Sequence, residues 1–167
     1  MKAPGQMPGL AIGIVRERDG KGQVKLSYPW LDDALQSDWV PVAAGMSGGG
    51  SGVFMMPEAG DEVVVGFLHG QFESPVVLGF LWNGVDKPPS NDPRERMICS
   101  RNGHKVRFID STQNAGDKGA LVVEDAHGNT ITLSNGKIAL AAIAILEISA
   151  PVVTINGRVV QPSASPI

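Results

Sequence analysis

From Ile138 to Val152, every second residue of the chain is apolar. This phase consists of Ile138, Leu140, Ala142, Ala144, Leu146, Ile148, Ala150 and Val152. Successive side chains of a β-strand point to opposite faces, so this alternation predicts extended chain with one continuous apolar face. The other phase of the stretch is polar only at Glu147 and Ser149. A single thin sheet would therefore expose apolar area on both faces, which monomers rarely tolerate.

Tight-turn signals divide the second half of the chain into short strands. Asn-Gly pairs, which favour the positive φ angles of hairpin turns, occur at 102–103, 135–136 and 156–157. The strands predicted between the turn signals of this half are Lys105–Asp110, Ala120–Glu124, Asn129–Ser134 and Lys137–Ala141. Phe108 is the only aromatic residue here, and a segment of roughly 60 residues can scarcely enclose a core alone.

Several identical chains that pack the same face around a common axis would bury this apolar surface. The apolar pattern of the second half therefore predicts a homo-oligomer whose core is shared between chains. The side chains expected to line the shared core, taken as that of a trimer, are Val106, Phe108, Leu121, Val123, Ile131, Leu133, Ile138, Leu140, Leu146, Ile148 and Val152.

The first half of the chain has different chemistry. Eight of the nine aromatic residues lie between positions 28 and 82, and large rings fill wide globular cores. No segment shows a helical period, and turn signals bound six predicted strands. These are Leu10–Arg16, Gln23–Tyr28, Trp39–Ala43, Gly52–Met55, Glu62–Leu68 and Pro75–Leu81. The pattern predicts a small closed or nearly closed β-barrel.

Composition excludes several classes of function. The net charge is −3, and residues 26–86 contain eight acidic side chains and no lysine or arginine. A barrel of this charge is not expected to bind nucleic acid specifically. Cys99 is the only cysteine, so no disulfide forms within the chain. The longest apolar stretch has nine residues, well short of the roughly 20 that span a membrane.

Several motifs of the first half follow one another in an order and with a spacing that are typical of one family of barrels. They are Gly13-Ile14-Val15, Asp19-Gly20-Lys21-Gly22-Gln23-Val24-Lys25-Leu26, Pro29-Trp30, Ser37-Asp38-Trp39-Val40-Pro41-Val42, Pro57-Glu58-Ala59-Gly60-Asp61-Glu62-Val63-Val64-Val65-Gly66-Phe67, Gly70-Gln71-Phe72-Glu73-Ser74-Pro75-Val76-Val77-Leu78-Gly79 and Trp82-Asn83. The succession resembles the oligonucleotide/oligosaccharide-binding (OB) type barrel of one spike family. Phage baseplate assembly protein V, the tail-spike lysozyme of T-even-type phages and the Vgr proteins of type VI secretion share that barrel.

In that family, a triple-stranded β-helix follows the barrel. The resemblance therefore implies an all-β trimer, with an N-terminal OB-fold barrel and a C-terminal intertwined triple-stranded β-helix. It also implies a structural, non-enzymatic role as the central spike of a contractile injection machine, either a phage tail baseplate or a phage-tail-like particle. The expected divisions are an N-terminal arm at 1–8, the barrel at 9–84, a Pro-rich linker at 85–96, the trimeric β-helix at 97–161 and a tail at 162–167.

The resemblance also implies partners and a place of action. The spike would be made in the host cytoplasm, join a baseplate hub protein at its barrel, and enter a virion tail or phage-tail-like particle. It would meet the target membrane only mechanically. A blunt trimer end exposes unpaired strand edges, so a PAAR-like tip protein is expected to contact Val159, Val160 and Gln161. No cofactor is expected, and the His-x-His metal-binding tip of some relatives is missing.

Two alternatives stay open, a cell-wall hydrolase and a glycan-binding tail protein. Gly45-Met46-Ser47-Gly48-Gly49 has the spacing of a nucleophile elbow, but glycines follow where that motif needs a helix. Asp32-Asp33 and Asp61-Glu62 are adjacent carboxylates, which point to opposite faces of a strand. The sequence therefore predicts no catalytic residue. A basic cluster at Arg94, Arg96, Arg101, Lys105 and Arg107 predicts a solvated neck or ion pairs between chains.

Overall fold

The structure, a computed structural model, describes residues 7, 9–112 and 116–160. The chain divides into two compact units, Met1–Pro88 and Pro89–Ile167. Within the described residues, every regular element is a β-strand except the short 3-10 helix η1 (Leu68–Gly70). The all-β class predicted from the sequence is confirmed. No helix in the described part of the chain is long and apolar enough to cross a membrane.

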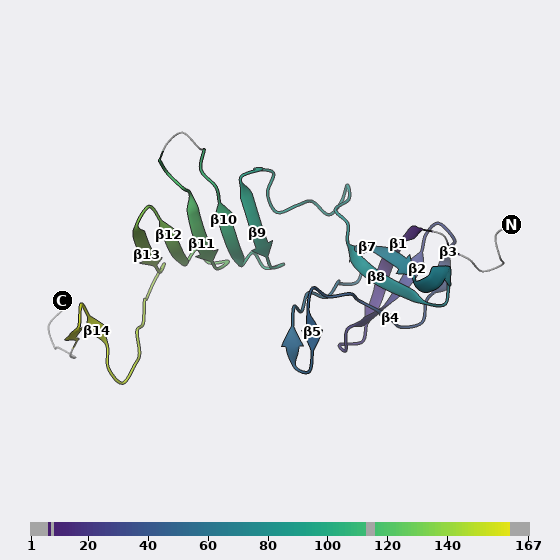
Figure 1. The fold of residues 1–167 in the computed structure, drawn as a ribbon, viewed down its shortest axis with the longest axis horizontal. Coiled ribbons are helices and arrows are strands. Elements are labelled where there is room, and N and C mark those ends of the chain that lie inside the picture. The colour runs from purple at the N-terminus through teal and green to yellow at the C-terminus, as the bar shows by residue number, and fades with distance from the viewer. Residues whose placement is uncertain (1–6, 8, 113–115, 161–167) are drawn as a thin grey trace. The chain divides into compact units, whose positions relative to one another are not determined.

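The first unit is built on one antiparallel sheet with the strand order β3-β2-β1-β7-β8 (Figure 1). Its strands are β1 (Leu10–Arg18), β2 (Gln23–Tyr28), β3 (Asp32–Gln36), β4 (Val40–Pro41), β7 (Glu62–Phe67) and β8 (Pro75–Phe80). The segment that contains β4 joins the two sides of this sheet. Val40 pairs with Val24 in β2, and Val42 forms a bridge to Val77 in β8. This double pairing closes the sheet into the predicted barrel.

Alternate residues of the barrel strands point inward and form one core. The fully buried apolar side chains are Val15, Val24, Leu26, Tyr28, Val40, Val63, Val65 and Val77. Phe72 packs against this core, with its ring centroid 5.6 Å from those of both Tyr28 and Phe67. Gly13 is buried between these side chains, because a Cβ there would lie 3.2 Å from Cγ2 of Val65. The interior is therefore mainly aliphatic, with Tyr28 as its one fully buried ring and Phe67 and Phe72 packed at its edge. The prediction that the aromatic residues fill the core is wrong for the other five rings of this region, Trp30, Trp39, Phe54, Phe80 and Trp82, which are exposed.

Three strand predictions in this unit need correction. Residues 32–36 form β3, which was not predicted because Asp-Asp-Ala-Leu-Gln has little strand propensity; pairing with β2 holds it in place. The strand predicted at Trp39–Ala43 is shorter in the structure, where only Val40–Pro41 form β4. The predicted strand Gly52–Met55 is mostly irregular, and only a small hairpin of β5 (Ser47–Gly48) and β6 (Ser51–Gly52) lies beside it.

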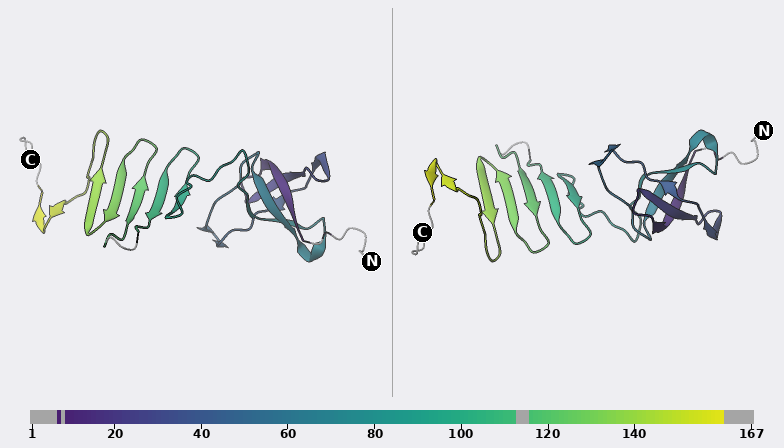
Figure 2. Two further views of the ribbon diagram at one scale, coloured as in Figure 1. Left: turned by 90° about the horizontal axis from the view of Figure 1, so that it is seen from above. Right: turned by 90° about the horizontal axis from the view of Figure 1, so that it is seen from below.

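The second unit is a five-stranded antiparallel meander with the order β13-β12-β11-β10-β9. Its strands are β9 (Glu95–Cys99), β10 (Lys105–Ile109), β11 (Ala120–Glu124), β12 (Thr130–Ser134) and β13 (Lys137–Ala141). Figure 2 shows these strands side by side in a single layer. Four of them match the predicted strands to within one residue at each end. The fifth, β9, was not predicted and begins at Glu95, inside the segment interpreted as a linker.

The chain beyond β13 forms little regular structure. Residues 142–153 lie in no strand, although the apolar alternation runs through them. A small hairpin of β14 (Thr154–Ile155) and β15 (Arg158–Val159) follows, and it turns at Asn156 and Gly157 with φ of 48° and 75°. The β12–β13 turn at Asn135 and Gly136 has the same geometry, with φ of 50° and 74°. The Asn-Gly signals at 135–136 and 156–157 therefore mark two-residue turns, as predicted. The third, at 102–103, lies in a longer turn in which Gly103 alone has a positive φ.

Candidate assembly interface

Strand register brings the predicted core residues of the second unit onto one face of its sheet. Residues directly opposite one another in antiparallel strands share a face. One row across the sheet is Ile98, Val106, Val123, Ile131 and Leu140. A second row on the same face is Phe108, Leu121, Leu133 and Ile138. We call these nine side chains the apolar face.

Nothing in the described chain covers the apolar face. Seven of its side chains are exposed, from 40% at Leu133 to 71% at Ile138, and only Val106 and Leu121 are half-buried. Ile98 was missed by the sequence analysis because β9 itself was missed; Met97, Ile98 and Cys99 are consecutive apolar residues, so no alternation marked this strand. In one chain this surface is a contiguous apolar patch of the kind that marks an interaction site.

The opposite face of the same sheet is mixed in polarity and carries a network of ion pairs. Arg107 lies at its centre and forms ion pairs with Glu95 in β9, at 3.1 Å, and with Glu124 in β11, at 2.7 Å. These three side chains are largely buried, and they tie three neighbouring strands together. Val122 is the only apolar side chain of the described second unit that a single chain buries. The sheet therefore has one face with ion pairs inside the chain and one apolar face that a single chain leaves uncovered.

The remaining predicted core residues lie beyond the sheet. Leu146, Ile148 and Val152 fall in the extended stretch after β13, and all three are exposed. Ile143 and Ile145, in the other phase of that stretch, are 74% and 83% exposed. No backbone hydrogen bond joins residues 144–152 to the rest of the described chain. The structure thus brings eight of the eleven predicted core residues onto one face and leaves three outside it.

Three arginines of the basic cluster form ion pairs within the chain. Arg94 donates to Asp92 at 2.7 Å, which holds the pKa of that carboxyl at about 2. Arg96 pairs with Asp110, and Arg107 forms the two ion pairs described above. Arg94 and Arg96 are more than half exposed despite these pairs, as a solvated neck requires, and pairs between chains stay a prediction.

Among the described residues, the side chains considered for catalysis are not arranged as a catalytic site requires. Ser47 lies in β5, in an exposed hairpin that no helix follows. Glu62 accepts a hydrogen bond from Asn83, and burial raises the pKa of Asp61, with the Asp86 charge adding to the effect. No cluster of three or more possible metal ligands occurs in the described ranges.

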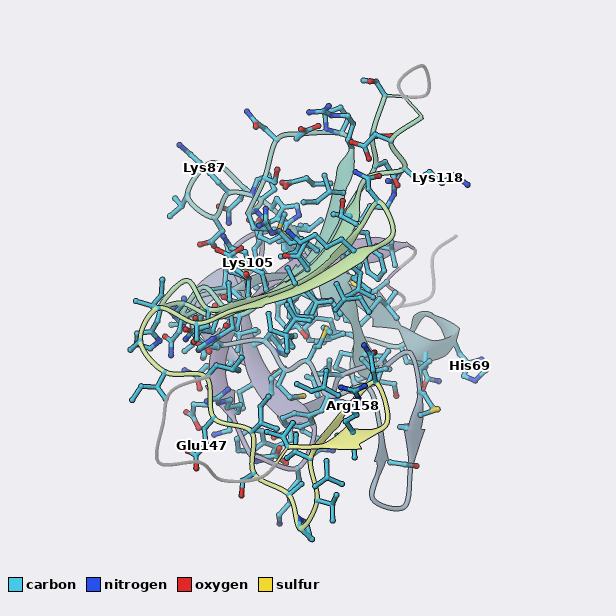
Figure 3. The ribbon with its side chains drawn as sticks, turned by 90° about the vertical axis from the view of Figure 1, so that its left-hand side faces the viewer. His69, Lys87, Lys105, Lys118, Glu147 and Arg158 are labelled. Atoms are coloured by element: carbon cyan, nitrogen blue, oxygen red, sulfur yellow. The ribbon has the colours of Figure 1, made fainter. Side chains whose placement is uncertain are left out.

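Histidines and the expected tip contacts are scattered over the chain. Figure 3 shows His69 projecting outward from η1, far in sequence from the two histidines in sheet turns.

Val159 ends β15, and both Val159 and Val160 are exposed. Gln161, the third expected tip contact, lies outside the described residues, as does the tail at 162–167.

The barrel region identifies the family. Residues 11–82 match the family described as the type VI secretion system/phage-baseplate injector OB domain. That match spans the barrel strands from β1 to β8. The barrel region of this chain belongs to that family, which confirms the resemblance found in the sequence.

Curated relatives are spike proteins of type VI secretion. The spike protein VgrG2a of Pseudomonas aeruginosa is 30% identical over 86 residues, which cover 49% of this chain and 10% of VgrG2a. The actin cross-linking toxin VgrG1 of Vibrio cholerae is 32% identical over 99 residues, 55% of this chain and 9% of the toxin. The spike protein VgrG3 of Vibrio cholerae is 32% identical over 134 residues, 75% of this chain and 12% of VgrG3.

The extent of these alignments bears on both units. The alignment with VgrG3 is longer than the first unit, so the likeness continues into the second. The chain spans only about a tenth of the length of these relatives. The chain is thus related to injection-machine spike proteins through its barrel and part of its sheet.

Proposed function

We propose that this protein is the structural central spike of a contractile injection machine, in a phage tail baseplate or a phage-tail-like particle. The observation that carries the proposal is the uncovered apolar face on a one-layer sheet, which follows a barrel of the injector OB family. A one-layer sheet with one ion-paired face and one apolar face suits a rigid prism made of several chains.

The proposed assembly is a homotrimer with the three apolar faces turned toward a common axis. In this arrangement the Arg107 face points to solvent, and the shared core replaces the one that a single chain lacks. Residues 144–152, extended and without backbone partners, would pair between chains and form the intertwined part of a triple-stranded β-helix. No chain could then leave without breaking strand ladders to its neighbours, which suits a part that transmits force.

The proposed partners follow from the two ends of the spike. A baseplate hub protein binds at the barrel, and a PAAR-like tip protein caps the end near Val159 to Gln161. The protein is made in the host cytoplasm, enters the particle during assembly, and meets the target membrane only mechanically. No step of this role requires a cofactor.

A direct test examines the particles themselves. Tail-like particles purified from the producing strain should contain this protein, and electron microscopy should place it on the particle axis at the baseplate. Intact contractile particles that lack the protein would contradict the proposal.

The tip contact has its own test. Truncation after Ile155 removes β15 and the residues beyond it, and should leave the assembled spike intact while abolishing capture of a purified PAAR-like protein encoded beside it. Capture of that protein with unchanged affinity would show that the tip contact lies elsewhere.

The proposed role is mechanical, and the enzymatic alternative makes a contrary prediction. A cell-wall hydrolase would clear peptidoglycan in a zymogram, and clearing by the pure protein that Ser47→Ala abolishes would overturn the non-enzymatic role. If the protein is a structural spike, neither the unmodified protein nor Ser47→Ala clears peptidoglycan.

A further inference from the structure

Two turns at the same end of the C-terminal sheet are built in the same way. They are Ser100–His104, between β9 and β10, and Asp125–Asn129, between β11 and β12. In each, the N–H of the first residue donates to the carbonyl of the fifth, at 2.8 and 3.1 Å. The side chain of the first accepts from the N–H of the fifth, at 3.0 and 2.9 Å. The fourth residue is a glycine in both, with φ of 92° and 93°.

Each turn is tied to the next segment at this end of the sheet by the side chain of its fifth residue. His104 accepts a hydrogen bond at Nδ1 from the N–H of Ala126, at 3.2 Å. Asn129 accepts one at Oδ1 from the N–H of Ile143, at 2.8 Å. Ala126 and Ile143 are each the second residue after a strand, so the two ties occupy equivalent places. The turns therefore form a ladder in which each one holds the next.

The two ties differ in chemistry. An amide oxygen accepts a hydrogen bond at any pH, whereas an imidazole nitrogen accepts one only while it is unprotonated. Histidine changes its protonation between pH 5 and 8, and both ring nitrogens of the protonated form are donors. We propose that His104 is a pH-sensitive latch, which ties the first turn to the second at neutral pH and releases it on acidification.

The charged groups around the latch lie on its own hairpin and on the facing turn. Arg101 and Lys105 are those of its own hairpin. On the facing turn, the pKa of Asp125 is held at about 2, chiefly by the Asn129 side chain, so this carboxylate is ionised throughout the range. Glu124 is paired with Arg107. His127, whose Nδ1 lies 3.6 Å from Oδ2 of Asp125, is the one other histidine at this end of the sheet.

The latch is tested by amide hydrogen exchange of the full-length protein, followed by NMR from pH 7.5 to pH 5. The protection factor of the Ala126 amide, corrected for the intrinsic pH dependence of exchange, should fall about fivefold as one hydrogen bond is lost. The Ile143 amide serves as an internal control, since its tie to Asn129 does not titrate, and its protection should stay constant.

Three variants separate the latch from general loosening of the sheet. His104→Asn should make Ala126 protection independent of pH, and Asn129→His should make Ile143 protection depend on it. His127→Gln should leave the response of Ala126 unchanged. The proposal is overturned if Ala126 and Ile143 lose protection together, if neither responds to pH, or if the response persists in His104→Asn.

Discussion

Single polar residues in turns hold the second unit together where it has no core. Asp125 is the clearest case, because its carboxylate accepts hydrogen bonds from the N–H groups of His127 and Asn129 and from the Asn129 side chain. Such turn residues replace some of the constraint that packing supplies in the barrel. Their effect can be measured one residue at a time.

The first prediction concerns the titration of Asp125. Its pKa is lowered to about 2 from an ordinary 3.8, chiefly by the Asn129 side chain. A depressed pKa means that the carboxylate stabilises the folded chain above pH 3.8, and that this contribution is lost as the pH falls toward 2. Asn129→Ala should move the NMR titration midpoint of the Asp125 carboxyl up toward 3.8.

The control for this prediction is Asp92, which Arg94 holds and Asn129 does not. Its midpoint should stay near 2 in Asn129→Ala. An unchanged Asp125 midpoint, or an equal rise at both carboxyls, would show that the Asn129 side chain is not the main cause.

At the scale of elements, local signals located most strands and missed those held by pairing alone. β2, β11 and β13 lie where apolar alternation and turn signals predicted them. β3 and β9 lack that alternation; β3 is held by its pairing with β2, and β9 by β10 together with the Glu95–Arg107 ion pair. The alternation after Ala141 also predicted extended chain, but a period of two cannot say which chain supplies the pairing strand.

The second prediction concerns the three-strand tie through Arg107. Replacing Arg107 with Met keeps the apolar stem and leaves the carboxylates of Glu95 and Glu124 without their partner. This change should destabilise the second unit by about 1–3 kcal/mol. Urea unfolding at one matched chain concentration measures it, since assembly makes stability depend on concentration.

Arg94→Met is the matched control, because Arg94 lies just before β9 whereas Arg96 stands opposite Phe108 on the apolar face. Arg94 is more than half exposed in its pair with Asp92, and surface pairs contribute little to stability. The Arg107 variant should therefore unfold at clearly lower urea than the Arg94 variant. Equal midpoints would mean that the Arg107 tie adds no more than an exposed pair.

At the scale of the whole molecule, the two units differ in how they are stabilised. The barrel buries its own core of valines, Leu26 and Tyr28, and the sequence predicted both its class and its family from motifs within about 80 residues. The sheet buries almost nothing by itself, and the sequence signal for that was the long apolar phase with a single aromatic. Residues such as Ile148 have no partner in one chain, so their place depends on other copies.

The third prediction concerns the residues proposed to hold the copies together. Leu140→Asp and Ile148→Asp each place one carboxylate per chain near a shared axis without a counter-charge, which strongly disfavours assembly. Both variants should be monomeric in solution. Thr132→Asp, on the opposite face of the same sheet, should assemble normally. Assembly of both core variants would rule out the shared apolar core.

The most direct measurement for the whole account is the mass of the purified full-length protein by light scattering. The chain has a mass of 17.5 kDa. A spike with a shared apolar core predicts a species about three times as heavy, at all concentrations down to the nanomolar range, with loss of that species in Leu140→Asp. A stable 17.5 kDa monomer with the unmodified sequence would contradict the account.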